Sequence, residues 1–494
     1  MIFRSIAALA FASYMSAQVS LFPGNNIQAV VDAHPPGTSF TLTGGIYRQQ
    51  SIVPKSGDFF QGLPGAVLDG AKVLPSGNWF TDGTLWADPT DYTAKFPGWQ
   101  QNGFCDAAHP ACTYPEDLFY DNIPKNRALP NPDCPTAMHA AGSGSWCIDY
   151  GYGIVYSKDD PTGHTVELSA TRSAFSGSAS RVRIVNLTVE KYAVPGQFGA
   201  IGDQYPGTGW TIERNVVRWN HGAGINVTTN ARIINNFIHD NGEKGVGAGG
   251  GNVLIQGNEI SGNNYAGFGC NWECGGVKAA QVNGYTVQSN YVHDNAGPGL
   301  WTDIDSIYVS YTGNDVRNNK YEGIAHEISY DAAITNNILC GNYDRGAGVT
   351  SGPNLSITTS RNVRVDKNRF VITGEGNVIY LHQDGRMGTV GAYGVHALTN
   401  DRITNGDISV AAPPTPGFPK GLSMIWWDAG SMPTGNTFDS NHYHVQDPGS
   451  SNYSNFGGYL TFANWQAIYG FDVHGSVDST VGSCPAPIAA GPGQ

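Results

Sequence analysis

Short apolar runs alternate with polar turns along the middle of the chain, and this pattern repeats at spacings of 21, 22, 32, 24 and 23 residues. Each repeat has a leading Asn, a Gly four residues later and then an apolar run. The leading residues are Asn220, Asn241, Asn263, Asn295, Asn319 and Asn342, and the glycines are Gly224, Gly245, Gly267, Gly299, Gly323 and Gly346. A second row lies five residues ahead, at Asn215, Asn236, Asn258, Asn290, Asn314 and Asn337. Self-similarity at this period is typical of a solenoid.

The apolar runs are predicted to be strands, because no stretch of the sequence has a helical period over more than two turns. Several strands in a repeat of this length predict a parallel β-helix. A leucine-rich repeat has a similar period, but the fixed row of Leu residues is missing from the sequence. Turn Asn side chains in a β-helix can hydrogen-bond the backbone of neighbouring coils, so we expect the Asn rows to be mainly structural.

The same pattern divides the chain into five parts. A basic start followed by a short apolar run is typical of a secretory signal, and a helix at residues 27–33 is expected to cap the first coil. The predicted parts are the signal peptide at 1–17, the N-terminal cap and first coils at 18–75, a disulfide-tied β insertion at 76–165, the β-helix repeats at 166–400, and an irregular C-terminal cap region at 401–494.

Composition narrows the function. Charged residues make up only 14% of the 494 residues, hydrophobic residues make up 40%, and the net charge is −13. The acidic balance argues against nucleic acid or an anionic membrane as partner. After the signal, no apolar run is long enough to span a membrane. We therefore expect a secreted monomer whose partner is a polysaccharide or oligosaccharide, with no metal and no cofactor.

The eight cysteines form an even set, which in a secreted chain favours disulfides, and their spacing fits no zinc pattern. Neighbours in sequence suggest three pairs: Cys105 with Cys112, Cys134 with Cys147, and Cys270 with Cys274. Such bonds suit the Pro-rich insertion, which has little core of its own.

Two carboxylates coincide in successive repeats. Counted from the leading Asn, the fifth position is apolar and faces the core, so the sixth and eighth positions face outwards. The eighth positions of two neighbouring repeats are Asp303 and Glu327. Because stacked strands lie about 4.8 Å apart, the two carboxyl groups are expected at roughly 5 Å, the separation in retaining glycosidases. Two such groups repel, which raises one pKa and leaves the other group ionised. The diagonal pair Asp305 and Glu327 would lie nearer the inverting distance.

Several residues around these acids are candidates for binding substrate. Trp301 occupies an outward position and is expected to offer a platform for a sugar ring. The 32-residue repeat adds a loop on the same face, and glycines at 247, 249 and 269 are expected to clear a groove. The candidate binding residues are Trp301, Asp305, Lys278, Trp272, Glu273 and Asn271. The plain alternatives are a solvated acidic surface, or a calcium site made by Asp303 with Asp305.

Two motifs carry a resemblance to a known family. The segment Gly299-Leu-Trp-Thr-Asp303 is followed one coil later by Gly323-Ile-Ala-His-Glu327-Ile-Ser-Tyr, and then by Ile334-Thr-Asn-Asn-Ile338. This arrangement resembles secreted right-handed parallel β-helix glycoside hydrolases, above all the retaining β-xylosidases of that fold. The resemblance implies that Asp303 is the nucleophile and Glu327 the acid/base. His326 faces inwards by parity and is expected to be a hydrogen-bonded core residue.

Two other classes of function stay open. A polysaccharide lyase of the parallel β-helix type would use Lys278 as base and calcium held by acidic residues such as Glu273, Asp303 and Asp305. A non-catalytic glycan-binding or adhesin β-helix would not need paired carboxylates. The sequence thus predicts a carbohydrate-active enzyme, with a retaining glycoside hydrolase as the first hypothesis.

Overall fold

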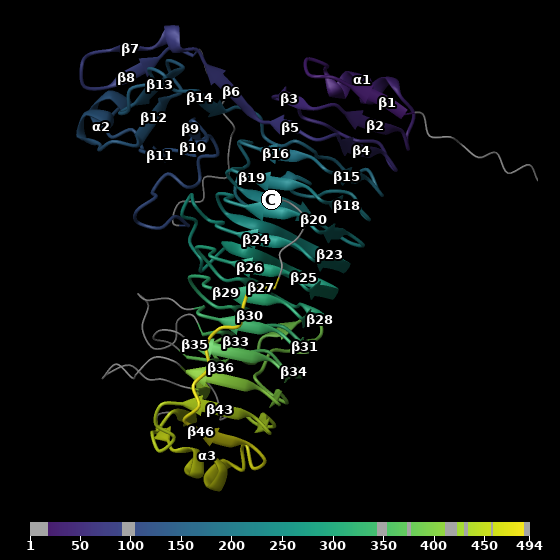
Figure 1. The fold of residues 1–494 in the computed structure, drawn as a ribbon, viewed down its shortest axis with the longest axis vertical. Coiled ribbons are helices and arrows are strands. Elements are labelled where there is room, and N and C mark those ends of the chain that lie inside the picture. The colour runs from purple at the N-terminus through teal and green to yellow at the C-terminus, as the bar shows by residue number, and fades with distance from the viewer. Residues whose placement is uncertain are drawn as a thin grey trace, which may run out of the picture.

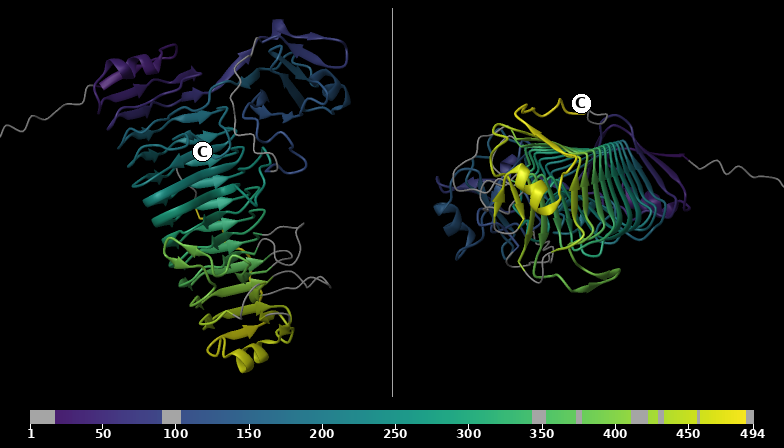
Figure 2. Two further views of the ribbon diagram at one scale, coloured as in Figure 1. Left: turned by 180° about the vertical axis from the view of Figure 1, so that it is seen from behind. Right: turned by 90° about the horizontal axis from the view of Figure 1, so that it is seen from below.

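The computed structural model describes residues 18–90, 104–342, 353–372, 377–410, 422–428, 433–455 and 458–488. The predicted signal peptide lies outside these ranges. The chain forms an elongated parallel β-helix, with a separate β-rich insertion beside its N-terminal coils (Figure 1). Seen along its axis, the coils stack almost in register around a continuous apolar core (Figure 2).

The strands of the coils form three parallel sheets, of which sheet 1 begins at β17 (Gly199–Ile201). Sheet 1 contains β17 (Gly199–Ile201), β20 (Ala223–Val227), the first halves of β23 (Lys244–Gln256) and β25 (Gly275–Gln288), β27 (Leu300–Asp303), β30 (Ile324–Glu327), β33 (Leu355–Thr358), β36 (Ile379–Gln383), β41 (Ser423–Trp427) and β44 (Tyr453–Asn455). Sheet 2 contains β1 (Gln18–Leu21), β2 (Ser39–Leu42), β4 (Phe59–Gly62), β15 (Arg183–Val185), β18 (Thr211–Glu213), β21 (Arg232–Ile234), the second halves of β23 and β25, β28 (Ile307–Thr312), β31 (Ala332–Thr335), β34 (Val363–Asp366), β39 (Arg402–Thr404) and β42 (Thr437–Asp439). Sheet 3 contains β3 (Gly45–Arg48), β5 (Ala66–Asp69), β16 (Thr188–Glu190), β19 (Val216–Arg218), β22 (Phe237–His239), β24 (Glu259–Ser261), β26 (Tyr291–His293), β29 (Asp315–Arg317), β32 (Ile338–Cys340), β35 (Arg369–Ile372), β40 (Asp407–Val410), β43 (His442–Val445) and β46 (Ser476–Asp478).

The two Asn rows form two buried ladders, as the repeat predicts. After the first Asn of each row, each side-chain oxygen accepts hydrogen bonds from the backbone and side-chain amides of the Asn one coil before, as Asn290 does from Asn258 at 2.9 and 3.0 Å. The side-chain amide of Asn290 also donates to the carbonyl of Ile255 at 3.0 Å. The residue before each of these Asn has a positive φ, for example 53° at Arg214 and 55° at Asn336. A left-handed residue followed by a buried Asn therefore makes each corner and satisfies its backbone groups.

The coils continue further than the period of the sequence indicates. Within 401–494, strands β40, β43 and β46 still stack in parallel on sheet 3. The far end is closed by helix α3 (Phe462–Tyr469), whose Trp465 is fully buried (Figure 1). At the other end, helix α1 (Ile27–Ala33) begins after the N-cap Asn26 and covers the first coil, as predicted. The cap at the C-terminal end is thus built on further coils. Their period is not visible in the sequence because long connections separate their strands.

The insertion has one antiparallel sheet and one mixed sheet, and its own apolar cluster around Trp146. One sheet contains β6 (Ala71–Leu74), β9 (Leu118–Tyr120), β10 (Ile123–Pro124) and β14 (Val166–Ser169). The other contains β7 (Phe80–Thr81), β8 (Trp86–Asp88), β11 (Asn126–Arg127), β12 (Ser145–Asp149) and β13 (Ile154–Ser157), and helix α2 (Cys134–Ala140) packs on it. This second sheet is mixed, because β11 pairs in parallel with β12.

All eight cysteines are paired in disulfides. The structure joins Cys105 to Cys112, Cys134 to Cys147, Cys270 to Cys274 and Cys340 to Cys484. The last bond holds the C-terminal tail, which runs back along sheet 3 and is also bound by Arg317. Four disulfides are typical of a protein that folds in an oxidising compartment. In the described ranges, no helix has the length and apolarity needed to cross a membrane.

Candidate functional site

Asp303 and Glu327 lie at the ends of two paired strands of sheet 1. Strand β27 pairs with β30 in a register that sets Leu300 against Ile324, Trp301 against Ala325 and Thr302 against His326. The next residues in this register are the two acids. Their charges interact, because Glu327 acts to raise the pKa of Asp303. The structure thus brings the two predicted acids together on adjacent coils.

Asp303 is almost covered, with 7% of its surface exposed. Burial raises the pKa of its carboxyl group, and the cation of Lys278 opposes this shift. The Nζ of Lys278 lies 3.1 Å from the Asp303 carboxylate, and the backbone N–H of Ile304 donates to it at 2.8 Å. The carboxylate is therefore fixed in position by a cation and a backbone donor.

Glu327 opens onto a cleft of about 720 Å³. The indole N–H of Trp301 donates to one of its oxygens at 3.1 Å, and the guanidinium of Arg386 binds the other. Arg386 follows strand β36 and is also held by Asp384. The cleft is walled on one side by the loop of the insertion that carries Cys105. Asn271, one of the predicted binding residues, also lines it.

A row of alternating charges, which we call the charge row, leads away from Asp303 toward the N-terminal coils. It consists of Asp303, Lys278, Glu273, Lys244 and Glu243, each in ion-pair contact with the next. Burial raises the pKa of Glu243 to about 7, against the attraction of Lys244. Burial also acts to raise the pKa of Glu273, but Lys244 and Lys278 outweigh it and hold that pKa below its usual value.

Trp301 and Trp272, two of the predicted substrate-binding residues, are packed against other side chains of the protein. Trp301 is only 6% exposed, and the Lys278 ammonium lies 3.5 Å from the centre of its ring. It is therefore a positioning contact for Glu327 and one edge of the cleft. Trp272 packs against Phe104, with ring centres 4.5 Å apart, and its carbonyl accepts from Lys278.

Asp305, another predicted substrate-binding residue, faces a small hairpin. This hairpin is formed by β37 (Val390–Gly391) and β38 (Gly394–Val395). Asp305 accepts a hydrogen bond from Tyr330 at 3.1 Å and pairs with His396 at 2.9 Å. The two carboxylates of the calcium alternative, Asp303 and Asp305, thus have different partners. In the part of the chain that the structure describes, no group of three or more His, Cys, Asp or Glu residues is placed to hold a metal ion.

The predicted positions are wrong in the 32-residue repeat. Strand β25 sets Val277 against Leu300 and Lys278 against Trp301, so Lys278 holds the sixth position that was assigned to Gly269. The extra residues lie between Asn263 and the strand, in a loop closed by the disulfide from Cys270 to Cys274. The same shift occurs after Asn342, where the strand begins at Leu355. The glycine at 346 and the positions assigned after it lie outside the described residues.

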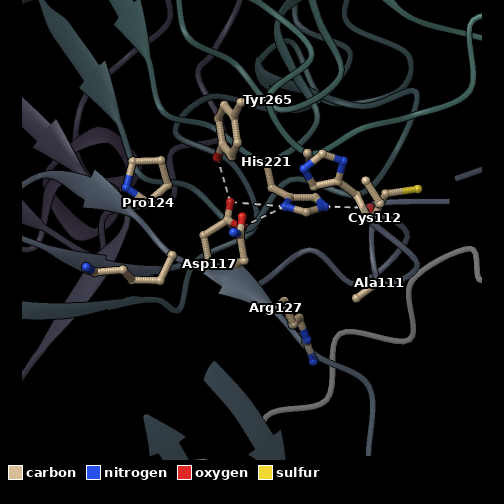
Figure 3. A pocket seen from close by; sticks show the side chains of 12 residues that line it. Ala111, Cys112, Asp117, Pro124, Arg127, His221 and Tyr265 are labelled. Atoms are coloured by element: carbon tan, nitrogen blue, oxygen red, sulfur yellow. Dashed lines mark hydrogen bonds and ion pairs between the residues drawn. The ribbon is translucent and has the colours of Figure 1, made fainter. Parts of the chain in front are cut away.

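A second cavity, of about 170 Å³, lies where the insertion meets the β-helix, and His221 is its centre (Figure 3). One ring nitrogen of His221 lies 3.0 Å from the carboxylate of Asp117, and the other lies 2.6 Å from the carbonyl of Cys112. Tyr265 donates to the same carboxylate at 2.7 Å. Both nitrogens of His221 face acceptors, an arrangement that suits the doubly protonated, charged ring. Burial acts to lower the pKa of His221, but Asp117 and these hydrogen bonds raise it overall. His221 lies in the corner after Asn220 and connects the insertion to the coils.

We expect His221→Gln to weaken the protein most at low pH. A group with a raised folded-state pKa stabilises fully below its unfolded pKa, and this stabilisation is lost as the pH rises through the folded pKa. The variant should lose roughly 3 kcal/mol at about pH 6, and the loss should shrink toward about pH 9. Urea unfolding across this range measures it, with the exposed His164→Gln as the control. A loss that is constant with pH would contradict a charged His221.

The comparisons with known proteins agree with this architecture. The family model of the right-handed β-helix region matches residues 202–370. The chain contains a right-handed β-helix. A solved structure of XylC with xylose has 14% identity and a TM-score of 0.66, and the match covers 94% of this chain and 86% of that one. The A-module of the mannuronan C-5 epimerase AlgE4 of Azotobacter vinelandii has 14% identity and a TM-score of 0.47, with 87% and 95% covered. A mutant of DFA-IIIase from Arthrobacter chlorophenolicus, in complex with DFA-III, has 13% identity and a TM-score of 0.44, with 94% and 99% covered. At 14% identity, the likeness to the structure of XylC shows the fold alone. No curated protein matches the chain.

Proposed function

We propose that the protein is a secreted carbohydrate-active enzyme, a retaining glycoside hydrolase with Asp303 as nucleophile and Glu327 as acid/base. The observation that carries this proposal is the register of β27 and β30, which sets the two carboxylates on adjacent coils beside a cleft. A separation near the strand spacing of about 4.8 Å suits a double displacement. The likeness to the structure of XylC with xylose agrees with a carbohydrate substrate.

The proposed reaction gives each of the two acids one role. A carboxylate oxygen of Asp303 attacks the anomeric carbon, the bond to the glycosidic oxygen breaks, and Glu327 gives its proton to the leaving oxygen. Glu327 then takes a proton from water, which attacks the same carbon and frees Asp303. Lys278 and the N–H of Ile304 hold the nucleophile during both steps. Arg386 lines the cleft with Glu327, so a bound sugar would compete for its hydrogen bonds to this acid.

The lyase alternative requires Lys278 to act as a base. Its Nζ lies 3.1 Å from Asp303 and 3.7 Å from Glu273, so the side chain is held in two ion pairs and is not directed at a substrate. These ion pairs favour the hydrolase.

Proton NMR of the first product formed from a panel of aryl glycosides and polysaccharides tests the proposal. A product with the anomeric configuration of the substrate is the expected result. An inverted product, or an unsaturated one with calcium-dependent formation, would overturn the retaining hydrolase and move the assignment to an inverting enzyme or a lyase.

A further inference from the structure

A groove of about 530 Å³, separate from the cleft at Glu327 and from the cavity at His221, lies on the N-terminal side of the acids. It runs along the axis of the β-helix. Its lining comes from β20, β23 and β25, which are consecutive in sheet 1 and lead to β27 with Asp303 (Figure 1). Lys244, Glu273 and Lys278 of the charge row line it. Coils stack at about 4.8 Å, which is of the order of the length of one sugar ring in a chain. A chain lying in the groove would thus pass from coil to coil toward the coil of Asp303, whose ion-pair partner Lys278 lines the groove.

The groove is kept open by small residues. Gly247 could not carry a side chain without movement, because a Cβ there would lie 2.8 Å from the amide oxygen of Asn226. Gly249 has more space, with the carbonyl of Ala280 the nearest atom at 3.7 Å. A larger residue at Gly249 would therefore fit on the backbone and fill the groove.

The polar groups of the groove suit an uncharged chain. Both lysines that line it are ion-paired, Lys244 with Glu273 and Glu243, and Lys278 with Asp303. Their charges are thus already compensated and do not favour an anionic ligand. The other polar lining consists of amides and hydroxyls, the groups that hydrogen-bond sugar hydroxyls: Gln197, Gln204, Asn226, Thr228, Thr229 and Gln281.

An exposed aromatic residue stands in the lining contributed by the earliest coil. Tyr205 follows β17 and is 76% exposed. A ring this exposed contributes little to the core, but its apolar face can stack on the face of a sugar. Its place in the groove indicates that the ligand reaches at least as far as β20.

We infer that this groove binds several consecutive residues of an uncharged glycan chain, on the N-terminal side of the bond that is cleaved between Asp303 and Glu327. The inference rests on the proposed hydrolase, and it adds that the natural substrate is long. The enzyme would then act on chains and would gain affinity with each added sugar until the groove is filled.

Calorimetric titration of a Glu327→Gln protein tests the inference. This variant should cleave oligosaccharides only slowly, and its changed residue lies in the cleft of about 720 Å³ and not in the groove. The probes are β-1,4-linked xylo-, cello-, manno- and galacto-oligosaccharides of two to six residues, with oligogalacturonates as the charged comparison. We expect one neutral series to bind at least about tenfold more tightly at five residues than at two. Tyr205→Ala and Gly249→Leu should each weaken the longer ligands at least about fivefold, and Tyr152→Ala, an exposed residue of the insertion, should not. In otherwise wild-type protein, Tyr152→Ala should leave hydrolysis of aryl monoglycosides unchanged.

Affinity that does not depend on chain length, a preference for oligogalacturonates, or long-chain binding that both groove variants leave intact would each overturn the inference. These results are separate from the test of the hydrolase. If the groove does not bind chains but Asp303 is essential for turnover, only the inference about the groove fails. If binding depends on chain length but Asp303 is dispensable, only the proposed hydrolase fails.

Discussion

Asp303→Asn should reduce turnover of an aryl glycoside at least about a thousandfold and leave the fold intact. An amide cannot form the glycosyl ester, so the first displacement has no nucleophile. Steady-state kinetics at saturating substrate measure the loss, and far-UV circular dichroism with urea unfolding checks the fold. Binding of a neutral oligosaccharide should persist, because the loss concerns the chemical step.

The matched control is Asp305→Asn, two residues further along the same chain. Asp305 bonds to Tyr330 and His396 at the hairpin, away from Lys278, so its variant should keep most of the activity. Activity near that of the wild type in Asp303→Asn would refute the assignment. Equal loss in both variants would show that the segment matters only for structure.

The sequence was sufficient for the fold because the corners of the coils have a strict chemistry. A buried Asn at each corner must meet the Asn of the next coil, and this requirement keeps the two rows at constant offset from Asn215 to Asn342. The register of Asp303 and Glu327 could be predicted for the same reason. Between Asn295 and Glu327 the chain has no insertion, so counting from the Asn gives the right strand positions.

Counting from the leading Asn gives the wrong strand positions where extra residues are inserted between the corner and the strand. The loop that follows Asn263 shifts Lys278 into the row of Trp301, and the Gly-Gly pair at 275 and 276 before an apolar residue was the signal for the true strand start. Arg386 could not be predicted at all, because it reaches Glu327 from a segment 59 residues later, where the period is broken. The exposure of Trp301 was misjudged because alternation along a strand tells which side a residue faces, and not what covers that side.

Glu327→Gln should separate substrates by their leaving groups. Loss of the acid should slow natural oligosaccharides by at least about a thousandfold, whereas aryl glycosides with a strongly acidic phenol need little protonation and should lose less than about tenfold in the first step. Rates for a series of aryl leaving groups measure this difference. Glu322→Gln is the control, since Glu322 lines the same cleft and has no part in the proposed chemistry.

Rescue by azide tests whether Glu327 acts as the base on a covalent intermediate. In Glu327→Ala the covalent intermediate on Asp303 persists, because no base activates water, and azide can attack it without such help. We expect azide to raise turnover of activated aryl glycosides and to give a glycosyl azide of retained configuration. Arg386→Ala should not show this rescue, although Arg386 binds the same carboxylate. A glycosyl azide of inverted configuration would mean that azide displaces the leaving group directly, and Asp303 would then form no covalent intermediate.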